Sequence, residues 1–138
     1  AWNTFSGISF IFSMACLKQM ENLLEKMRDI VALWTVNPVE YDEIMCVRAV
    51  FNTETDDAKY IMKKAQRRFA DASTTYSKSC RDLKTCMDEG NASFCEFFEG
   101  INQEHLEELN LAREEKEACE KAISKIMEMW DIVDSFSA

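Results

Sequence analysis

Residues 4–34 read TFSGISFIFSMACLKQMENLLEKMRDIVALW, and this stretch decides the fold class. Its second half repeats apolar residues at helical spacing, at Cys16, Met20, Leu23, Met27, Ile30 and Trp34, with charged residues between them. Its first half is apolar on every side, through Phe5, Ile8, Phe10, Ile11 and Phe12. A helix that is apolar all round has to be enclosed by other elements or by lipid. We therefore expect one long helix around which the remaining helices wrap.

The composition of the whole chain supports an all-α fold. The 138 residues suffice for one domain with a hydrophobic core, so we expect residues 1–138 to form a single helical domain. Three Gly and one Pro are too few for the many turns of an all-β domain. Long helices with few connections are the expected result.

Boundary signals divide the rest of the chain into helices. Asn37 and Pro38 are typical of a helix start, and Asn52, Thr53 and Thr55 interrupt the pattern that follows. That short helix should bury Ile44, Met45 and Val50. A long apolar stripe then runs until Gly90, and a short segment with Phe94, Phe97 and Phe98 ends at Gly100 and should plug one end of the bundle. The sequence thus predicts a disulfide-stabilised bundle of three long helices, about 4–35, 55–89 and 103–135, and two short ones, about 38–51 and 93–98.

The chain contains six cysteines, none in a C-x-x-C pair, and one histidine. This set favours three disulfides over a metal site, and disulfides favour a secreted protein in an oxidising compartment. No signal peptide is visible, so we expect a mature chain whose leader has been removed. The sequon at Asn91 would be a glycosylation site in a eukaryotic secretory pathway.

Six cysteines allow fifteen pairings, which sequence alone does not resolve. Helix positions suggest one set. Cys86 and Cys95 flank a single tight reversal and should close most easily. If the third helix runs antiparallel to the first, Cys80 can reach Cys16, which leaves Cys46 and Cys119 as the third pair.

The residues required for catalysis or metal binding are missing. His105 begins a helix, where Glu108 one turn later could share a metal with it, but a helix-bundle di-iron site needs a histidine on each of two helices. We interpret His105 as an exposed surface residue. No G-x-S-x-G elbow and no Gly-rich phosphate loop occur. The sequence therefore predicts a protein that is not an enzyme and has no catalytic residue, cofactor or metal.

The chain contains eight methionines: Met14, Met20, Met27, Met45, Met62, Met87, Met127 and Met129. Their role allows two interpretations. Such residues commonly fill a helical core. Together with nine Phe they could instead line an adaptable cavity for a small apolar ligand or lipid. An extracellular carrier of such a ligand is our alternative function.

Charge is distributed unevenly. The net charge of −9 argues against nucleic acid and against an anionic membrane surface as partner. The chain contains no run of about twenty apolar residues, so we expect no transmembrane helix. The aromatic segment 2–12 could still attach to a membrane surface. One outer helix face is nevertheless basic, and we call it the basic stripe: Lys63, Lys64, Arg67, Lys78 and Arg81. The last helix should bury an apolar stripe, formed by Leu109, Ala112, Cys119, Ile123, Ile126, Trp130 and Val133. Its first half is otherwise acidic, at Glu104, Glu107, Glu108, Glu114, Glu115, Glu117 and Glu120. These opposite faces favour electrostatically steered protein binding, with the basic stripe as the contact.

The start Ala1-Trp2-Asn3-Thr4, the helical character and the cysteine placement resemble small salivary proteins of blood-feeding insects. Within that group the chain resembles the anopheline salivary inhibitors of the alternative complement pathway, of the albicin type. The resemblance covers the whole chain without a diagnostic motif, so it assigns no functional residue. It implies binding to the C3 convertase assembled from activated C3 and factor B. Odorant-binding proteins fit worse, because their second and third cysteines are three residues apart, whereas Cys46 and Cys80 are distant.

Overall fold

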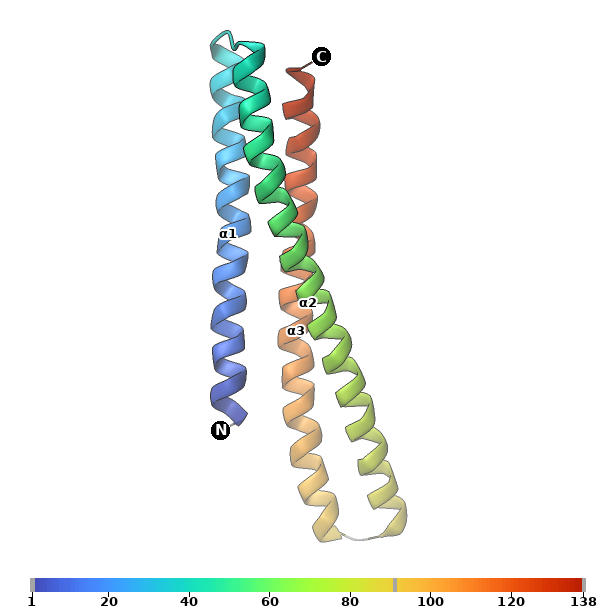
Figure 1. Cartoon of the computed structure of the whole chain (residues 1–138). Helices are drawn as coiled ribbons and strands as arrows, with labels where there is room; N and C mark the ends of the chain where they lie inside the picture. Colours follow the sequence, from blue (N-terminus) through green and yellow to red (C-terminus); the bar gives the residue numbers. More distant parts are fainter. Residues whose placement is uncertain (1, 91, 138) are drawn as a thin grey trace.

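The protein consists of three long helices: α1 (Trp2–Val36), α2 (Tyr41–Glu89) and α3 (Ala92–Ser135) (Figure 1). The computed structural model describes residues 2–90 and 92–137, and side-chain surroundings from residue 14 onward. No strand occurs in this described part. The all-α class predicted from the sequence is confirmed.

The helices form an up-down-up arrangement in which α1 and α3 run parallel to each other and antiparallel to α2. At 1.5 Å per residue α2 is about 73 Å long and α1 about 52 Å. The end of α2 and the beginning of α3 therefore extend as a two-helix hairpin past the beginning of α1 (Figure 1). Three helices overlap only in the other part of the molecule.

The prediction of two short helices is wrong. The first of them, 38–51, and the long segment 55–89 belong to one helix, α2. Asn52, Thr53 and Thr55 do not interrupt it. The Thr53 hydroxyl donates to the Ala49 carbonyl oxygen at 3.4 Å, one turn back. The Thr55 hydroxyl is buried and accepts a hydrogen bond from Trp130 Nε1 of α3 at 2.9 Å. Both polar side chains thus have partners that leave the helical backbone intact.

The segments 93–98 and 103–135 likewise form one helix, α3. Gly100 does not end it, and in the described part of the chain only Gly90 has a positive φ. Gly90, at φ 75° with its N–H donating to the Met87 carbonyl oxygen at 3.1 Å, ends α2 as predicted. A single Gly inside a helix costs only about 1 kcal/mol, which one continuous helix tolerates.

The connection between α1 and α2 also differs from the prediction. Asn37 does not cap a helix that starts at Pro38; its backbone N–H and its side-chain Nδ2 both donate to the Leu33 carbonyl oxygen, at 3.0 and 3.5 Å. Asn37 therefore completes the end of α1. The next helix begins at Tyr41 after Glu40, whose backbone is extended.

The core lies where all three helices overlap. It contains Met20, Leu23, Leu24, Met27 and Trp34 from α1; Ile44, Phe51, Ala58 and Ala65 from α2; and Cys119, Ala122, Ile123, Ile126, Trp130 and Val133 from α3. The predicted apolar faces of α1 and α3 are thereby confirmed. Of the three residues expected to be buried in the segment 38–51, Ile44 is buried, whereas Met45 and Val50 are exposed.

The enclosure expected for α1 rested on its apolar beginning. In the part with described side chains α1 is amphipathic: one face belongs to the core shared with α2 and α3, and Leu33 and Met14 remain about half exposed, at 49% and 54%. The side chains of Phe5, Ile8, Phe10, Ile11 and Phe12 lie outside the described residues.

Candidate functional site

The basic stripe lies on the outer face of α2, and all five of its side chains are exposed. From Lys63 to Arg81 it extends about 27 Å along the helix. Lys64 Nζ lies 4.7 Å from the centre of the Tyr60 ring, which is itself 61% exposed. The stripe thus includes an aromatic side chain that sequence reasoning did not select.

None of the five stripe cations forms an ion pair with any described residue. The neighbouring Arg68 differs, because its guanidinium is bound by the Glu115 carboxylate of α3, with Nε 2.8 Å from Oε1. Arg48 is similarly bound by Asp134 and lies 5.7 Å from the centre of the Trp130 ring. The helix therefore uses its inward-facing cations for packing and leaves the stripe available to a partner.

The acidic face of α3 is partly used within the molecule. Besides Glu115, two of its carboxylates have cationic or histidine neighbours: Lys116 Nζ lies 3.0 Å from Glu120 Oε1, and His105 Nδ1 lies 3.6 Å from Glu108 Oε2. Glu104, Glu107, Glu114 and Glu117 are exposed.

His105 is not the exposed residue expected from the sequence. Its side chain is only 16% exposed, and the structure brings it to Glu108 as the helical spacing indicates. No group of three or more His, Cys, Asp or Glu among the described residues is placed to hold a metal ion. Packing and a local electrostatic contact account for its position.

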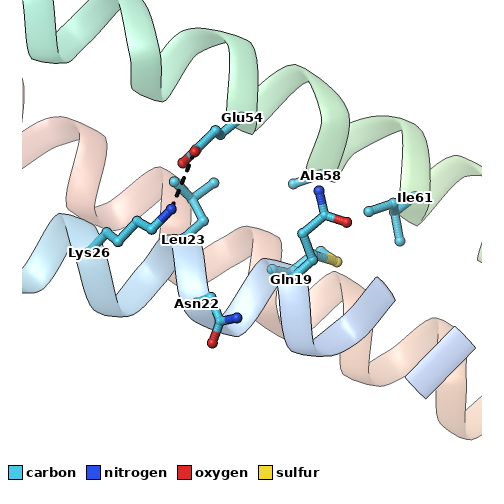
Figure 2. A pocket seen from close by; sticks show the side chains of 8 residues that line it. Gln19, Asn22, Leu23, Lys26, Glu54, Ala58 and Ile61 are labelled. Carbon is cyan, nitrogen blue, oxygen red and sulfur yellow. Dashed lines mark hydrogen bonds and ion pairs between the residues drawn. The ribbon is translucent and has the colours of Figure 1, made fainter. Parts of the chain in front are cut away.

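The described part of the chain contains two hollows between α1 and α2. Figure 2 shows a pocket of about 190 Å³ in which Gln19 of α1 points towards Ala58 and Ile61 of α2, and Leu23 of α1 points towards Glu54. An ion pair between Lys26 Nζ and Glu54 Oε1, at 3.5 Å, crosses its end. An open groove of about 450 Å³ lies beyond Lys26 and is lined by Asp29, Ile30, Cys46, Val47, Val50 and Phe51.

Neither hollow is the Met- and Phe-lined cavity expected from the composition. Met20 and Phe51 are the only residues of those two types that line them. Two methionines, Met20 and Met27, are buried in the core, and two more, Met62 and Met129, pack against it. Met14, Met45, Met87 and Met127 are exposed. Core filling therefore accounts for half of the methionines.

The end of the α2–α3 hairpin exposes apolar side chains. Phe94 and Phe97 are 59% and 63% exposed, and Met87 beside them on α2 is 60% exposed. The expectation that Phe94, Phe97 and Phe98 plug one end of the bundle is therefore wrong. Among the described residues, no third helix lies beside the end of the hairpin, which extends past the beginning of α1 (Figure 1).

The cysteines lie in three regions of the molecule. Cys86 and Cys95 face each other at the end of the hairpin, with their Sγ atoms 3.2 Å apart. Cys80 Sγ accepts a hydrogen bond from Asn102 Nδ2 at 3.2 Å, farther along the same hairpin. Cys119 is buried in the core, and Cys46 is exposed beside the groove between α1 and α2.

Two of the three expected cysteine pairings do not fit this arrangement. Cys80 contacts Asn102, which precedes Cys119 by roughly 25 Å of helix. Cys46 lies roughly as far from Cys119, because the Arg48 beside it contacts Asp134 near the end of α3. A disulfide requires Cα atoms within about 7 Å, so Cys46–Cys119 is too long. Cys16–Cys80 fails for the same reason, because Cys16 lies one turn before Met20, which shares the core with Cys119 of α3. The Cys86–Cys95 pairing stays a prediction.

The chain matches no family model, no curated protein and no solved structure. No helix in the described residues combines the length and the apolar character needed to cross a membrane. The glycosylation predicted at Asn91 falls on a residue outside the described part.

Proposed function

We propose that this chain is a secreted, non-enzymatic inhibitor that binds another extracellular protein through the basic stripe of α2. The observation that carries the proposal is the contrast between the cations of one helix. Arg48 and Arg68 have carboxylate partners on α3, whereas the five stripe cations are exposed and have no ion-pair partner among the described residues.

Such a surface suits an acidic partner. On a protein of net charge −9, a cationic face about 27 Å long concentrates the local positive potential, which accelerates association with an acidic surface and orients it. The exposed Tyr60 ring beside Lys64 adds apolar contact area, and tyrosine is enriched in protein interfaces. The long α2 helix fixes the backbone of the stripe, so the entropy lost on binding comes from its side chains and not from ordering of the backbone.

The alternative complement pathway is the first partner system to test, because the sequence resembles the albicin-type inhibitors. The assay is lysis of rabbit erythrocytes in human serum under magnesium-EGTA conditions, which isolate that pathway, with the purified protein titrated in. We expect inhibition at submicromolar concentration through the C3 convertase formed from C3b and factor B.

Charge reversal identifies the contact surface. The test variant carries Lys63→Glu, Arg67→Glu and Arg81→Glu. The matched control changes the net charge equally at three exposed cations away from the stripe, Lys18→Glu, Arg28→Glu and Lys121→Glu. We expect the first variant to lose at least tenfold in inhibition and the control to retain it. Equal inhibition by both variants would contradict the stripe as contact, and an inactive wild-type protein would remove complement as the target.

The open groove between α1 and α2 favours a second candidate, a carrier of a small apolar ligand. Its lining is mainly aliphatic, from Ile30, Val47 and Val50, and also includes Phe51 and Lys26. Native mass spectrometry of protein from its natural source would reveal a bound ligand as added mass. If only the mass of the chain itself appears, the carrier function is excluded.

A further inference from the structure

The parallel register of α1 and α3 places two cysteines opposite each other. The Trp34 and Phe136 rings are 5.5 Å apart and mark which levels of the two helices meet. Five helical turns back from Trp34 along α1 is Cys16, on the same face of the helix. Phe136 directly follows the last residue of α3, and about the same distance back along α3 is Cys119. Parallel helices have the same rise per residue, so these two cysteines lie at one level.

Both cysteines face the interface between their helices. Cys119 is 1% exposed and belongs to the core stripe with Ile123 and Ile126. Cys16 is half-buried, one turn before Met20, which belongs to the same core. The pKa of Cys119 is raised chiefly by burial, and the Cys16 thiolate is among the charges that raise it further. This influence of Cys16 on Cys119 agrees with the closeness that the register indicates.

The remaining cysteines divide into one pair and two separate residues. Cys86 and Cys95 have Sγ atoms 3.2 Å apart, about 1 Å more than a sulfur–sulfur bond. Cys80 is engaged by Asn102, and Cys46 lies beside Ile30 at the other end of the bundle. Cys46 is therefore distant from Cys80 and from the two pairs. Cys80 lies about 9 Å along α2 from Cys86, beyond the roughly 7 Å Cα separation that a disulfide allows.

We propose that oxidation of this protein forms two disulfides, Cys16–Cys119 between α1 and α3 and Cys86–Cys95 between α2 and α3, and leaves Cys46 and Cys80 as thiols. With these bonds α3 becomes covalently attached to both other helices. The first bond attaches α1 to α3 one turn before Met20, where the described core of α1 begins. The second closes the end of the hairpin, which α1 does not reach.

The chemistry requires an external disulfide as oxidant, for which glutathione disulfide serves. One cysteine thiolate attacks it and releases one glutathione thiolate, and the second cysteine then displaces the other glutathione from the mixed disulfide. For each bond formed, the protein gives up two protons and two electrons, and one glutathione disulfide becomes two glutathione thiols. The inference does not depend on which partner the protein binds.

Trypsin separates the possible pairings without ambiguity. It places Cys16 in peptide 1–18, Cys46 in 29–48, Cys80 in 79–81 and Cys119 in 117–121, and it keeps Cys86 and Cys95 together in 85–113. The full chain is refolded in glutathione redox buffer, its thiols are blocked with N-ethylmaleimide, and the digest is analysed by mass spectrometry without reduction.

We expect peptides 1–18 and 117–121 to be joined with loss of two hydrogens, and peptide 85–113 to be two hydrogens lighter and unlabelled. Peptides 29–48 and 79–81 should each carry one maleimide. Linkage of 1–18 to 79–81, linkage of 29–48 to 117–121, or labelling of all six cysteines would overturn the proposal.

Two serine variants extend the test. Cys16→Ser should leave Cys119 as a thiol that is labelled only after denaturation, with the 85–113 bond intact. Cys46→Ser is the matched control, and its linked peptides should be unchanged. Because Cys16 is only half-buried, its replacement keeps the experiment decisive even if a change at the buried Cys119 prevented folding. A new link from Cys119 to Cys46 in the Cys16→Ser variant would contradict the register argument.

Discussion

Replacing Gly100 by Ala tests whether α3 is one helix. The sequence pattern places a helix end at Gly100, whereas the structure continues the helix through it from Ala92 to Ser135. The two possibilities predict opposite effects on stability. In a helix interior Ala is favoured over Gly, and at a left-handed helix end it is disfavoured.

The magnitude follows from the local geometry. A Cβ atom added at Gly100 would have no neighbouring atom within 4 Å, so steric strain does not offset the gain in helix propensity. The Gly100→Ala variant should therefore be more stable by about 0.8–1.0 kcal/mol. For a chain of this size that raises the melting temperature by roughly 3–4 °C.

Gly90 provides the matched control. A Cβ there also meets nothing within 4 Å, but the backbone has φ +75°. Gly90→Ala should lower stability by about 1–2 kcal/mol because of the left-handed conformation alone. Thermal unfolding followed by circular dichroism measures both variants, and hydrogen exchange of the amides around residue 100 reports the local effect. If Gly100→Ala lowers stability or weakens amide protection there, α3 is not continuous and the reasoning is refuted.

Two further predictions concern buried polar groups. Thr55→Val removes the acceptor of the Trp130 indole N–H without changing the side-chain volume, so the free energy of unfolding measured in urea should fall by about 1–3 kcal/mol. Thr55→Ser keeps the acceptor and should lose only about 1 kcal/mol. A Val variant more stable than the Ser variant would contradict this prediction. Burial, followed by the influence of Cys95 and Glu89, raises the pKa of Cys86 to about 11. In the reduced protein, iodoacetamide should therefore modify the exposed Cys46 far faster than Cys86 at pH 8. The modification rate of Cys86 should rise about tenfold per pH unit up to about pH 11. Because the folded state then holds this proton more tightly than the unfolded chain, the reduced protein should lose stability as pH rises from about 9 to 11.

Local signals predicted individual features where a residue's own chemistry decides the outcome. Gly90 ends α2 because only Gly adopts the left-handed conformation without strain. The core faces of α1 and α3 follow from apolar spacing, since a helix repeats every 3.6 residues whatever it packs against. The exposed basic stripe follows from the same periodicity, because five cations in one sector face away from the apolar side.

Local signals failed where a weak preference competed with distant contacts. Asn52 and Gly100 each disfavour a helix by about 1 kcal/mol or less, and continuous packing between α2 and α3 outweighs that. The predicted burial of Phe97 was wrong for a related reason. An aromatic ring is buried only if some element reaches it, and the described part of α1 does not extend to the hairpin end.

The sequence by itself determined that this chain is helical, which residues of α1 and α3 form the core and which face of α2 is cationic, because each depends on residue spacing within one helix. It also determined where α2 ends, because Gly90 adopts a backbone conformation that other residues disfavour. The tertiary structure alone decided which helix levels meet. That register brings Cys16 level with Cys119, separates Cys46 from it by roughly 25 Å, and gives Arg68 a carboxylate partner that the stripe cations lack. Contacts between residues far apart in the chain depend on the relative lengths and directions of whole helices, which no local pattern encodes.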